Sequence, residues 1–228
     1  MTPEHGDMGA FDRATLLRQT LVGATGALLA GTLAGCGRAS TGADRRGDTT
    51  QADATHKVLI AYFSRAGENY YYGGRRDLKT GNTQALAATI RKHIAADVYR
   101  IHAADPYPHD YEATVARNVR EQNADARPRI ANPLKSIDDY DVILLGSPIW
   151  NVRPPMIMST LAESVDFSGK TIHPFVTYAV SELGTTMETY RSLVGGARIG
   201  AGLAVLGETV RQADPQVRTW LRRINLLP

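Results

Sequence analysis

Cysteine is almost absent from this sequence, because among its 228 residues only Cys36 carries a thiol. One cysteine cannot form an internal disulfide, and it cannot by itself supply a structural zinc site. The six histidines are scattered without the spacing of metal ligands, so no metal centre is expected. The formal net charge is only +3 and the sequence contains no arginine-rich helix, which argues against a nucleic-acid-binding protein.

A short apolar run precedes the cysteine. Residues 20–35, TLVGATGALLAGTLAG, follow two separate arginines and are too few for a comfortable membrane span of about 20 residues. This pattern is typical of a signal peptide, and its end, Leu33-Ala34-Gly35-Cys36, resembles the bacterial lipobox, in which the cysteine is lipidated. We therefore expect residues 1–35 to be a lipoprotein signal peptide and Cys36 to anchor the protein to the extracytoplasmic face of the cell membrane. The alternatives are an uncleaved signal anchor and a buried helix with an incidental cysteine.

The segment after the cysteine has little capacity to fold. Residues 37–56 contain almost no large apolar side chain and cannot bury a core, so we interpret residues 36–56 as a flexible tether. Regular apolar patterns begin only at Lys57. The predicted organisation is therefore a signal peptide (1–35), a tether (36–56) and one folded domain (57–228).

The folded part alternates between strand-like and helix-like patterns. Strand-like segments, some of them continuous apolar runs that suit strands covered on both faces, occur at residues 57–63, 97–102, 141–146, 171–178 and 197–205. Helical patterns separate or follow them, at residues 83–95, 111–124, 155–163, 185–193 and 215–225. This alternation predicts an α/β fold with a doubly wound, five-stranded parallel sheet and helices on both faces. The strand order 2-1-3-4-5 is favoured over a Rossmann order, because no G-x-G-x-x-G follows the first strand.

In a sheet of this order, the loops after strands one, three and four meet at the carboxyl edge, where ligands bind. The first of these loops ends in Thr80-Gly81-Asn82-Thr83 at a predicted helix start. Free backbone N–H groups and hydroxyls at a helix N-terminus suit an anion, and Arg65 could add positive charge. The alternative is that Asn82 or Thr83 only caps the helix.

The other two loops offer groups for a flat ligand. Trp150 directly follows a predicted buried strand, and its ring could lie against a flat ligand or, alternatively, pack under the following helix. The loop after the fourth strand offers Tyr178, Ser181 and Gly184, with free N–H groups expected in a short turn.

Together these loops resemble the flavodoxin-like FMN-binding proteins, especially the bacterial branch with a G-x-P-I-W loop, over residues 57–225. The resemblance implies a flavodoxin-like fold, FMN as the cofactor, and a phosphate held by Ser64, Asn82 and Thr83. It also implies that residues 146–150 form the isoalloxazine loop. The expected cofactor-binding residues are Ser64, Arg65, Gly81, Asn82, Thr83, Ser147, Pro148, Ile149, Trp150, Asn151, Tyr178, Ser181 and Gly184.

Two features depart from the family pattern. A second tryptophan often follows the first in this branch, but here Asn151 takes that position, so ring stacking is one-sided or is completed by Tyr178 or by the insertion described next. An insertion at residues 66–79, with three consecutive tyrosines at 70–72, splits the phosphate loop. This insertion either folds over the flavin as a flap or forms a mobile surface loop.

The resemblance implies redox chemistry carried by FMN, with the protein binding, orienting and tuning the ring. Backbone N–H groups of Trp150, Asn151 and the 181–184 turn would hydrogen-bond the flavin edge, and no catalytic side chain is expected. We expect an oxidoreductase that exchanges electrons with NAD(P)H, a quinone or a redox-protein partner. The alternatives are an exported electron carrier without substrate turnover and a surface lipoprotein whose flavin site is degenerate.

Overall fold

The structure is a computed structural model that describes residues 56–228. The predicted signal peptide, the predicted lipidation residue Cys36 and all but the last residue of the predicted tether lie outside the described residues. Within residues 56–228, no helix has the length and apolar character needed to cross a membrane.

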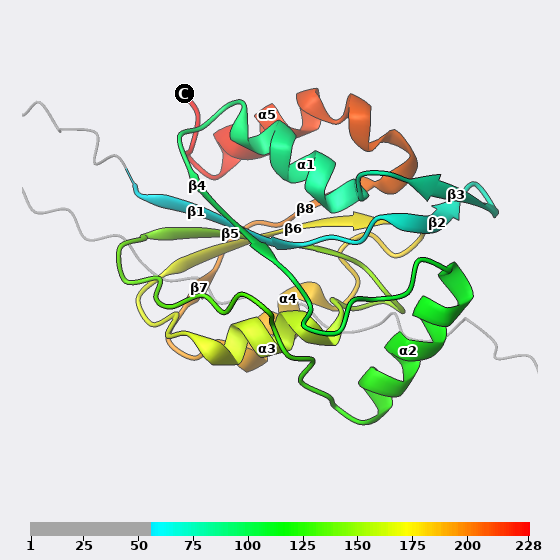
Figure 1. The fold of residues 1–228 in the computed structure, drawn as a ribbon. Coiled ribbons are helices and arrows are strands. Elements are labelled where there is room, and N and C mark those ends of the chain that lie inside the picture. The colour runs from blue at the N-terminus through cyan, green and yellow to red at the C-terminus, as the bar shows by residue number, and fades with distance from the viewer. Residues whose placement is uncertain (1–55) are drawn as a thin grey trace, which may run out of the picture. The chain divides into compact units, whose positions relative to one another are not determined.

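A parallel sheet forms the centre of the described part (Figure 1). β5 (Val142–Pro148) lies between β1 (Val58–Phe63) and β6 (Thr171–Tyr178). β4 (Asp97–Ile101) pairs with the other side of β1, and both β7 (Arg198–Ile199) and β8 (Leu203–Leu206) pair with the other side of β6. Counted along the chain, the five strand positions have the order 2-1-3-4-5, so the predicted flavodoxin-like topology is confirmed.

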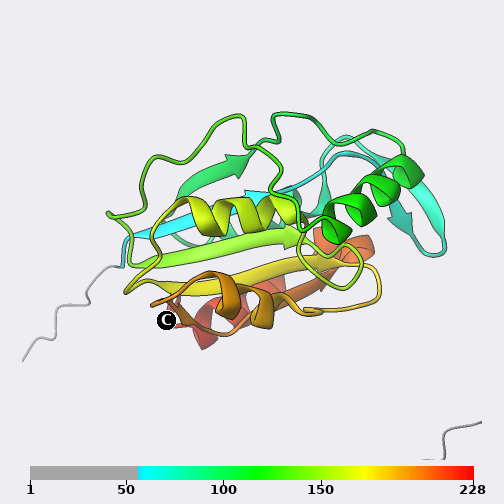
Figure 2. The ribbon, with the colours of Figure 1, turned by 90° about the horizontal axis from the view of Figure 1, so that it is seen from below.

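Helices cover both faces of this sheet (Figures 1 and 2). α1 (Asn82–Arg91) and α5 (Asp214–Arg223) lie on one face, and α3 (Met156–Ser164) and α4 (Thr186–Leu193) lie on the other. Residues of β1 alternate between the two layers: Val58, Ile60 and Tyr62 pack with α1 and α5, and the residues between them pack with α3. All six residues of β1 are buried for this reason, which explains the continuous apolar run. α2 (Tyr111–Asn123) lies beside the carboxyl end of the sheet.

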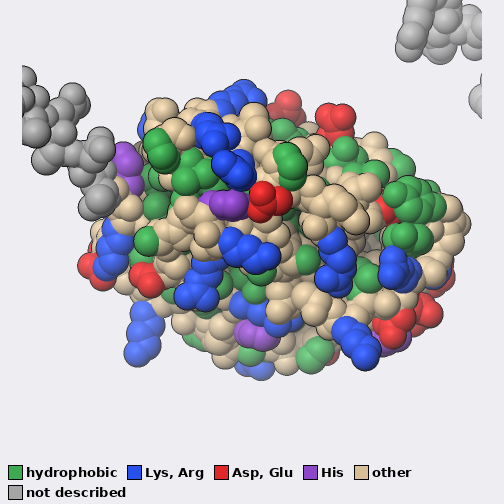
Figure 3. All heavy atoms as spheres, turned by 90° about the horizontal axis from the view of Figure 1, so that it is seen from above, with side chains coloured by type: hydrophobic (Ala, Val, Ile, Leu, Met, Phe, Trp, Pro, Cys, Tyr) green, Lys and Arg blue, Asp and Glu red, His purple; other side chains and the backbone are tan. Residues whose placement is uncertain are grey.

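The layer of α1 and α5 encloses the C-terminal part of the core. Val217, Trp220 and Leu221 of α5 are buried against the sheet, and a 3₁₀ helix, η1 (Gly207–Gln212), joins β8 to α5. α1 ends at Arg91 rather than at residue 95, because two i→i−3 hydrogen bonds tighten its last turn. On the outer side of this layer, Lys and Arg side chains lie spread among apolar and polar ones (Figure 3).

Two short strands, β7 and β8, share the fifth position of the sheet, although a single strand was predicted over residues 197–205. The Ile172 carbonyl of β6 points toward β7 and accepts a hydrogen bond from the Gly200 N–H (2.8 Å). Backbone orientation repeats every second residue in a strand, so the backbone of Pro174 faces the same neighbouring strand as that of Ile172. Proline has no N–H, so it cannot donate the next hydrogen bond of the ladder. The ladder therefore stops after β7 and resumes with β8 beside residues 175–178.

Side chains occupy the gap in this ladder. The Ala201 carbonyl accepts hydrogen bonds from Nδ1 of His173 (3.1 Å) and from Nε1 of Trp220 (3.0 Å). Gly200 lies so near the imidazole that a Cβ atom would be 2.3 Å from its Cε1. His173 is only 7% exposed, and burial lowers its pKa because the charged imidazolium is poorly solvated there.

The insertion at residues 66–79 forms an antiparallel hairpin of β2 (Gly67–Tyr71) and β3 (Gly74–Leu78). Tyr72 and Gly73 at its tip have φ values of +46° and +85°, as the tight turn of a two-residue hairpin requires. The hairpin stands at the carboxyl edge of the sheet, near the starts of α1 and α2 (Figure 1). The insertion therefore lies at the edge where ligands bind in sheets of this type.

Candidate functional site

The N-terminus of α1 lies against the end of β1. Gly81 is the N-cap residue, and a Cβ atom there would be 2.3 Å from the Arg65 carbonyl oxygen and 2.4 Å from Ser64 Oγ. Ser64 Oγ accepts a hydrogen bond from the Gln84 N–H (3.1 Å), so a side chain from the end of β1 caps the helix. Neither Asn82 nor Thr83 occupies the cap position, and the alternative that they only cap the helix is wrong.

Two backbone N–H groups at this helix start are available to a ligand. Within the described residues, the N–H groups of Asn82 and Thr83 have no protein acceptor, and they lie at the positive end of the helix dipole. The Thr83 hydroxyl is buried, 2.8 Å from Oγ1 of Thr177 on β6. N–H groups and hydroxyls thus converge on one corner of a cavity, which suits an anion.

Arg65 lines the same cavity but directs its guanidinium elsewhere. Nη1 donates to the carbonyl oxygens of Pro108 (2.7 Å) and His109 (2.9 Å), and Nη2 donates to the Glu68 carbonyl. Burial lowers the pKa of Arg65, and the carboxylates of Glu68 and Asp110 oppose this shift. The guanidinium joins the end of β1 to the hairpin and to the segment before α2, so these contacts give no support to a direct role in anion binding.

The loop after β5 turns sharply between Trp150 and Arg153. Asn151 and Val152 have φ values of +50° and +62°, a left-handed conformation that non-glycine residues rarely adopt. The Trp150 N–H donates to the Arg153 carbonyl (2.9 Å), so it is engaged within the loop rather than free for a flavin edge. Gln122 of α2 holds this turn, because Nε2 donates to the Trp150 carbonyl (3.0 Å) and Oε1 accepts from Nδ2 of Asn151 (2.9 Å).

The Trp150 ring stands edge-on against two aromatic neighbours. The centroid distances are 5.7 Å to Phe63 of β1 and 5.1 Å to Tyr107 in the segment before α2. The Tyr107 hydroxyl donates to Oε2 of Glu121 (2.7 Å), and burial raises the pKa of Tyr107. Trp150 is half-buried against the core cluster that includes Ile157 and Met158 of α3, and it also lines the first cavity, so both alternatives for its ring hold in part.

Only some of the predicted residues in the loop after β6 border a cavity. Tyr178 lines the first cavity, and Ser181 lines a neighbouring second cavity. Gly184 borders neither cavity, because its N–H donates to the Ser181 carbonyl (2.7 Å) and a Cβ atom would be 2.1 Å from the Val152 carbonyl oxygen. The predicted free N–H at Gly184 is therefore wrong, because the loops after β5 and β6 pack against each other there.

Ser147 also lies away from the cavity surface. It is completely buried in β5, whereas the next two residues, Pro148 and Ile149, line the first cavity. The fully buried Tyr190 of α4 lies near Ser147, and burial raises the pKa of Tyr190. Of the predicted isoalloxazine loop (146–150), residues 148–150 therefore border the first cavity and Ser147 belongs to the core, whereas Asn151, just after the loop, borders the second cavity.

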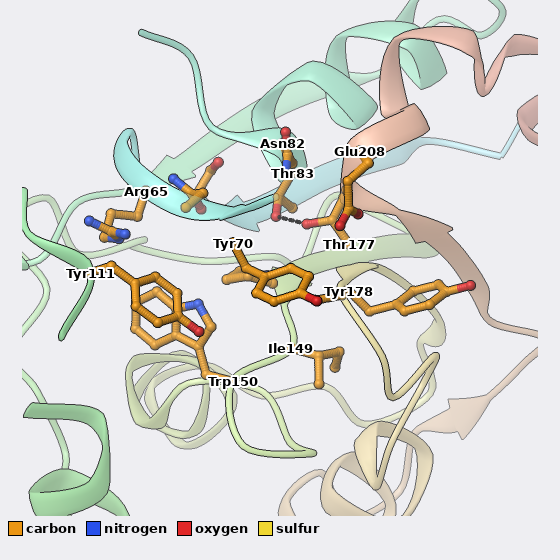
Figure 4. Close-up of a pocket in the computed structure, with 15 residues that line it drawn as sticks. Arg65, Tyr70, Asn82, Thr83, Tyr111, Ile149, Trp150, Thr177, Tyr178 and Glu208 are labelled. Atoms are coloured by element: carbon orange, nitrogen blue, oxygen red, sulfur yellow. Dashed lines mark hydrogen bonds between the residues drawn. The ribbon is translucent and has the colours of Figure 1, made fainter. Parts of the chain in front are cut away.

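The hairpin bounds the first cavity from the opposite side. Figure 4 shows the Tyr70 ring between the start of α1 and the loop after β5. Two contacts near its tip hold the hairpin: the Arg75 guanidinium lies 3.7 Å from the centroid of the Tyr111 ring of α2, and the Tyr72 N–H donates to Oε1 of Glu208 in η1 (3.2 Å). Of the two alternatives for the insertion, this placement favours the flap.

Several lining residues of the first cavity were not among the expected cofactor-binding residues: Tyr111, Thr177, Ala179, Gly207 and Glu208, and also Asn69 and Tyr70 of the insertion, for which a flap over the flavin was one of two alternatives. Thr177 and Ala179 flank the predicted Tyr178, so their position at the end of β6 could have predicted them. Gly207 and Glu208 follow β8, a strand whose loop was not expected at the site. Gly207 approaches Asn82 so closely that a Cβ atom would be 2.6 Å from its Nδ2.

Comparison of the sequence with known protein families identifies the family to which this arrangement of loops belongs. Residues 57–224 match the family model described as flavodoxin. The chain belongs to the flavodoxin family. The match spans nearly all of the described residues, so the flavodoxin assignment covers the parallel sheet and all three loops at its carboxyl edge.

Solved structures share this flavodoxin fold. A protein from Bacteroides eggerthii described as a flavoprotein is 29% identical, with a TM-score of 0.59 over 75% of this chain and 98% of that chain. A similarly described protein from Bacteroides uniformis is 28% identical, with a TM-score of 0.60 over 73% and 98%. A flavoprotein from Lactobacillus acidophilus in complex with FMN is 20% identical, with a TM-score of 0.50 over 72% and 98%. No curated protein matches this chain significantly.

Proposed function

We propose that this member of the flavodoxin family binds FMN at the carboxyl edge of its sheet and serves oxidoreduction or electron transfer. The main support is the corner between Ser64 and the start of α1, where two backbone N–H groups have no acceptor within the described residues. Gly81 fits this corner because any Cβ atom would collide with the end of β1. These donors suit a phosphate, and a protein of the same fold from Lactobacillus acidophilus forms a complex with FMN.

Ser64, Asn82 and Thr83 would hold the phosphate. The Ser64 hydroxyl accepts from the Gln84 N–H and keeps its own proton available for donation. The Thr83 hydroxyl can donate to a phosphate oxygen while it accepts from the Thr177 hydroxyl. Thr177 would then act as a positioning residue that orients Thr83.

The other end of the cavity suits a flat ring. Pro148, Ile149 and Trp150 follow β5, Tyr178 follows β6, and Tyr70 comes from the hairpin. These side chains offer apolar and aromatic surface that favours removal of a ring from water. Bound FMN would supply hydride or single-electron chemistry, whereas these residues would bind the ring, orient it and exclude water.

FMN titration tests this proposal. The full chain with Cys36→Ser is purified without lipid, and quenching of FMN fluorescence gives the dissociation constant. We expect saturable quenching and a bound-flavin absorption spectrum, both weakened by Ser64→Ala. Thr89→Val, on the same helix but bonded to the Ala85 carbonyl, is the control that should leave FMN affinity unchanged. A colourless protein that does not quench FMN would refute the proposal and favour a degenerate flavin site.

Turnover separates an oxidoreductase from an electron carrier. We favour the oxidoreductase, and the FMN-loaded protein is mixed with NADH or NADPH and an excess of an electron acceptor. Continuous oxidation of the nicotinamide at catalytic concentrations of protein supports the enzyme. Reduction by dithionite without nicotinamide turnover, followed by stoichiometric transfer to a redox protein, would instead identify a carrier.

We further propose that the protein is a lipoprotein held at the extracytoplasmic face of the cell membrane by Cys36. The support comes from the sequence, where the apolar run of residues 20–35 ends in Leu-Ala-Gly immediately before the cysteine. Labelling with an alkyne fatty acid and mass spectrometry of the N-terminal peptide should show cleavage before Cys36 and acylation of it. Equal labelling of the Cys36→Ser variant, or retention of residues 1–35, would contradict the anchor.

A further inference from the structure

A third cavity adjoins the phosphate corner of the first. It lies between the hairpin and η1, and it has a volume of about 420 Å³. Asn82, at the start of α1, lines both the first and the third cavity, and so do Tyr70, Gly207 and Glu208. In Figure 4, Asn82 and Glu208 lie at the same end of the first cavity. A group joined to a phosphate in the corner would therefore extend past Asn82 into the third cavity.

Three cations surround the third cavity: Arg76 of β3, Lys79 directly after β3, and Arg211 of η1. Within the described residues, no carboxylate forms a salt bridge with any of the three. Arg75, their neighbour on the hairpin, shows the usual situation, because its guanidinium is paired with Glu112 (2.6 Å). Basic side chains that gather around a hollow without carboxylate partners attract an anion.

The two carboxylates that also line this cavity have partners of their own. Oδ1 of Asp77 lies 2.9 Å from Nε2 of His109, and Oε1 of Glu208 accepts a hydrogen bond from the Tyr72 N–H (3.2 Å). Neither carboxylate is therefore paired with a cation of the cavity. Three cations against two carboxylates leave the lining with a net positive charge.

The distribution of charge suits two linked phosphates. A phosphate monoester carries about −1.5 to −2 charges at neutral pH, whereas each phosphate of a dinucleotide carries a single negative charge. Within the described residues, the corner at the start of α1 offers N–H groups and hydroxyls but no free cation, because the Arg65 guanidinium is engaged by backbone carbonyls. One charge in the corner and a second among the three cations of the third cavity would match this arrangement.

The other lining residues of the third cavity suit an adenosine. Leu78 and the buried Val210 offer apolar surface, and Tyr71 offers an aromatic ring on which a base can stack. Gln212 carries a primary amide, which can donate to and accept from the same edge of an adenine. The cavity thus combines cations for a phosphate with groups that recognise a base.

We propose that the third cavity binds the adenosine monophosphate half of FAD, so that the protein accepts this dinucleotide as well as FMN. The flavin half and its phosphate occupy the first cavity, and the second phosphate lies among Arg76, Lys79 and Arg211. This assignment rests on the proposed function, because the flavin half must be bound in the first cavity. It makes the hairpin and η1 the elements that select the form of the flavin.

Equilibrium dialysis tests the third cavity without any turnover. The Cys36→Ser full chain is dialysed against FAD and against FMN, and both flavins should bind. AMP should displace FAD but not FMN, because AMP competes only for the third cavity. Inorganic phosphate at the same concentration should displace neither flavin. If phosphate displaces FAD as well as AMP does, the cavity recognises a phosphate alone and the adenosine assignment is refuted.

A matched pair of double variants isolates the cations. Lys79→Ala/Arg211→Ala removes two exposed side chains, so the fold should persist, which a melting curve checks. The FAD dissociation constant should rise by about tenfold, the lower end of what a hydrogen bond to a charged group contributes, while FMN affinity stays within about twofold. Lys135→Ala/Arg191→Ala removes the same two residue types at exposed positions outside the three cavities and should change neither affinity.

The remaining outcomes decide between the cavity and the proposed function. Binding of FMN without binding of FAD would overturn the assignment, and so would equal losses of both affinities in Lys79→Ala/Arg211→Ala. If AMP displaces both flavins alike, AMP occupies the phosphate corner and the third cavity is not its site. If neither flavin binds but AMP binding still depends on Lys79 and Arg211, the proposed function fails while the third cavity keeps its nucleotide. If neither flavin nor AMP binds, both proposals fail.

Discussion

Replacing Thr83 by valine removes one hydroxyl from the start of α1 while keeping a β-branched side chain of nearly the same shape. Thr83 is 1% exposed, and its Oγ1 lies 2.8 Å from Oγ1 of Thr177, which is 4% exposed. In Thr83→Val the Thr177 hydroxyl loses this partner and stays buried. We expect the free energy of unfolding to fall by about 1–3 kcal/mol, the usual cost of a buried polar group left unpaired.

The effect on FMN affinity should be separate from the effect on stability. A hydrogen bond to a charged group contributes about 1.5–3 kcal/mol, which corresponds to roughly a 10- to 150-fold increase in the FMN dissociation constant for Thr83→Val. Thr177→Val keeps the Thr83 hydroxyl but not its orientation, so its loss of affinity should be smaller.

The double variant Thr83→Val/Thr177→Val completes the comparison. It removes both hydroxyls from the buried contact, so its stability should return toward that of the unmodified protein. Its FMN affinity should match that of Thr83→Val, because Thr177 acts on the phosphate only through Thr83. Urea unfolding measures the stability of the FMN-free proteins, and fluorescence titration measures FMN affinity in all four.

Two results would refute this reasoning. Affinity for FMN within twofold of the unmodified protein in Thr83→Val would remove the hydroxyl from the phosphate site. Additive losses of stability in the double variant would show that the two hydroxyls do not form a single buried contact.

Three further perturbations test other parts of the domain. Gly81→Ala should abolish measurable FMN binding in titration, because its Cβ would lie 2.4 Å from Ser64 Oγ; retained affinity would show that the corner is not the phosphate site. Glu208→Gln removes a carboxylate from the first cavity and should tighten FMN binding several-fold at low salt, with a smaller effect at high salt. Burial lowers the His173 pKa below its ordinary 6.5, so the unfolded chain binds protons more readily and stability should fall as the pH drops below about 6.5. Urea unfolding between pH 5 and about 8 should show this slope and its loss in His173→Gln, and an unchanged slope would contradict it.

Much of the architecture followed from the apolar pattern of the chain. Alternating strand and helix patterns predicted a parallel sheet of order 2-1-3-4-5, and the structure confirms that order. The same pattern predicted that the loops containing Thr83, Trp150 and Tyr178 would meet, and these three residues line one cavity. The prediction succeeded because parallel strands connected through helices all end at the same edge of their sheet.

Hydrogen-bond partners within the site were not predictable in this way. Thr177 binds Thr83 across 94 positions of sequence, and Gln122 reaches the turn at Trp150 from a helix 28 positions earlier. Such pairs depend on the packing of α1 and α2 against the sheet, which local patterns do not specify. The same holds for the hairpin, whose composition suited either a flap or a surface loop.

The sequence by itself thus determined the fold class, the strand order and the three loops that form the site, and it supplies the predicted anchor at Cys36. Only the tertiary structure showed that Arg65 turns toward the segment before α2, that Gly184 packs against Val152, and that Oδ1 of Asn118 has no donor within the described chain. The physical reason is the range of the interactions. Burial of apolar strands follows from neighbouring residues, whereas the pairing of a polar group depends on which distant side chain the completed packing brings within about 3 Å.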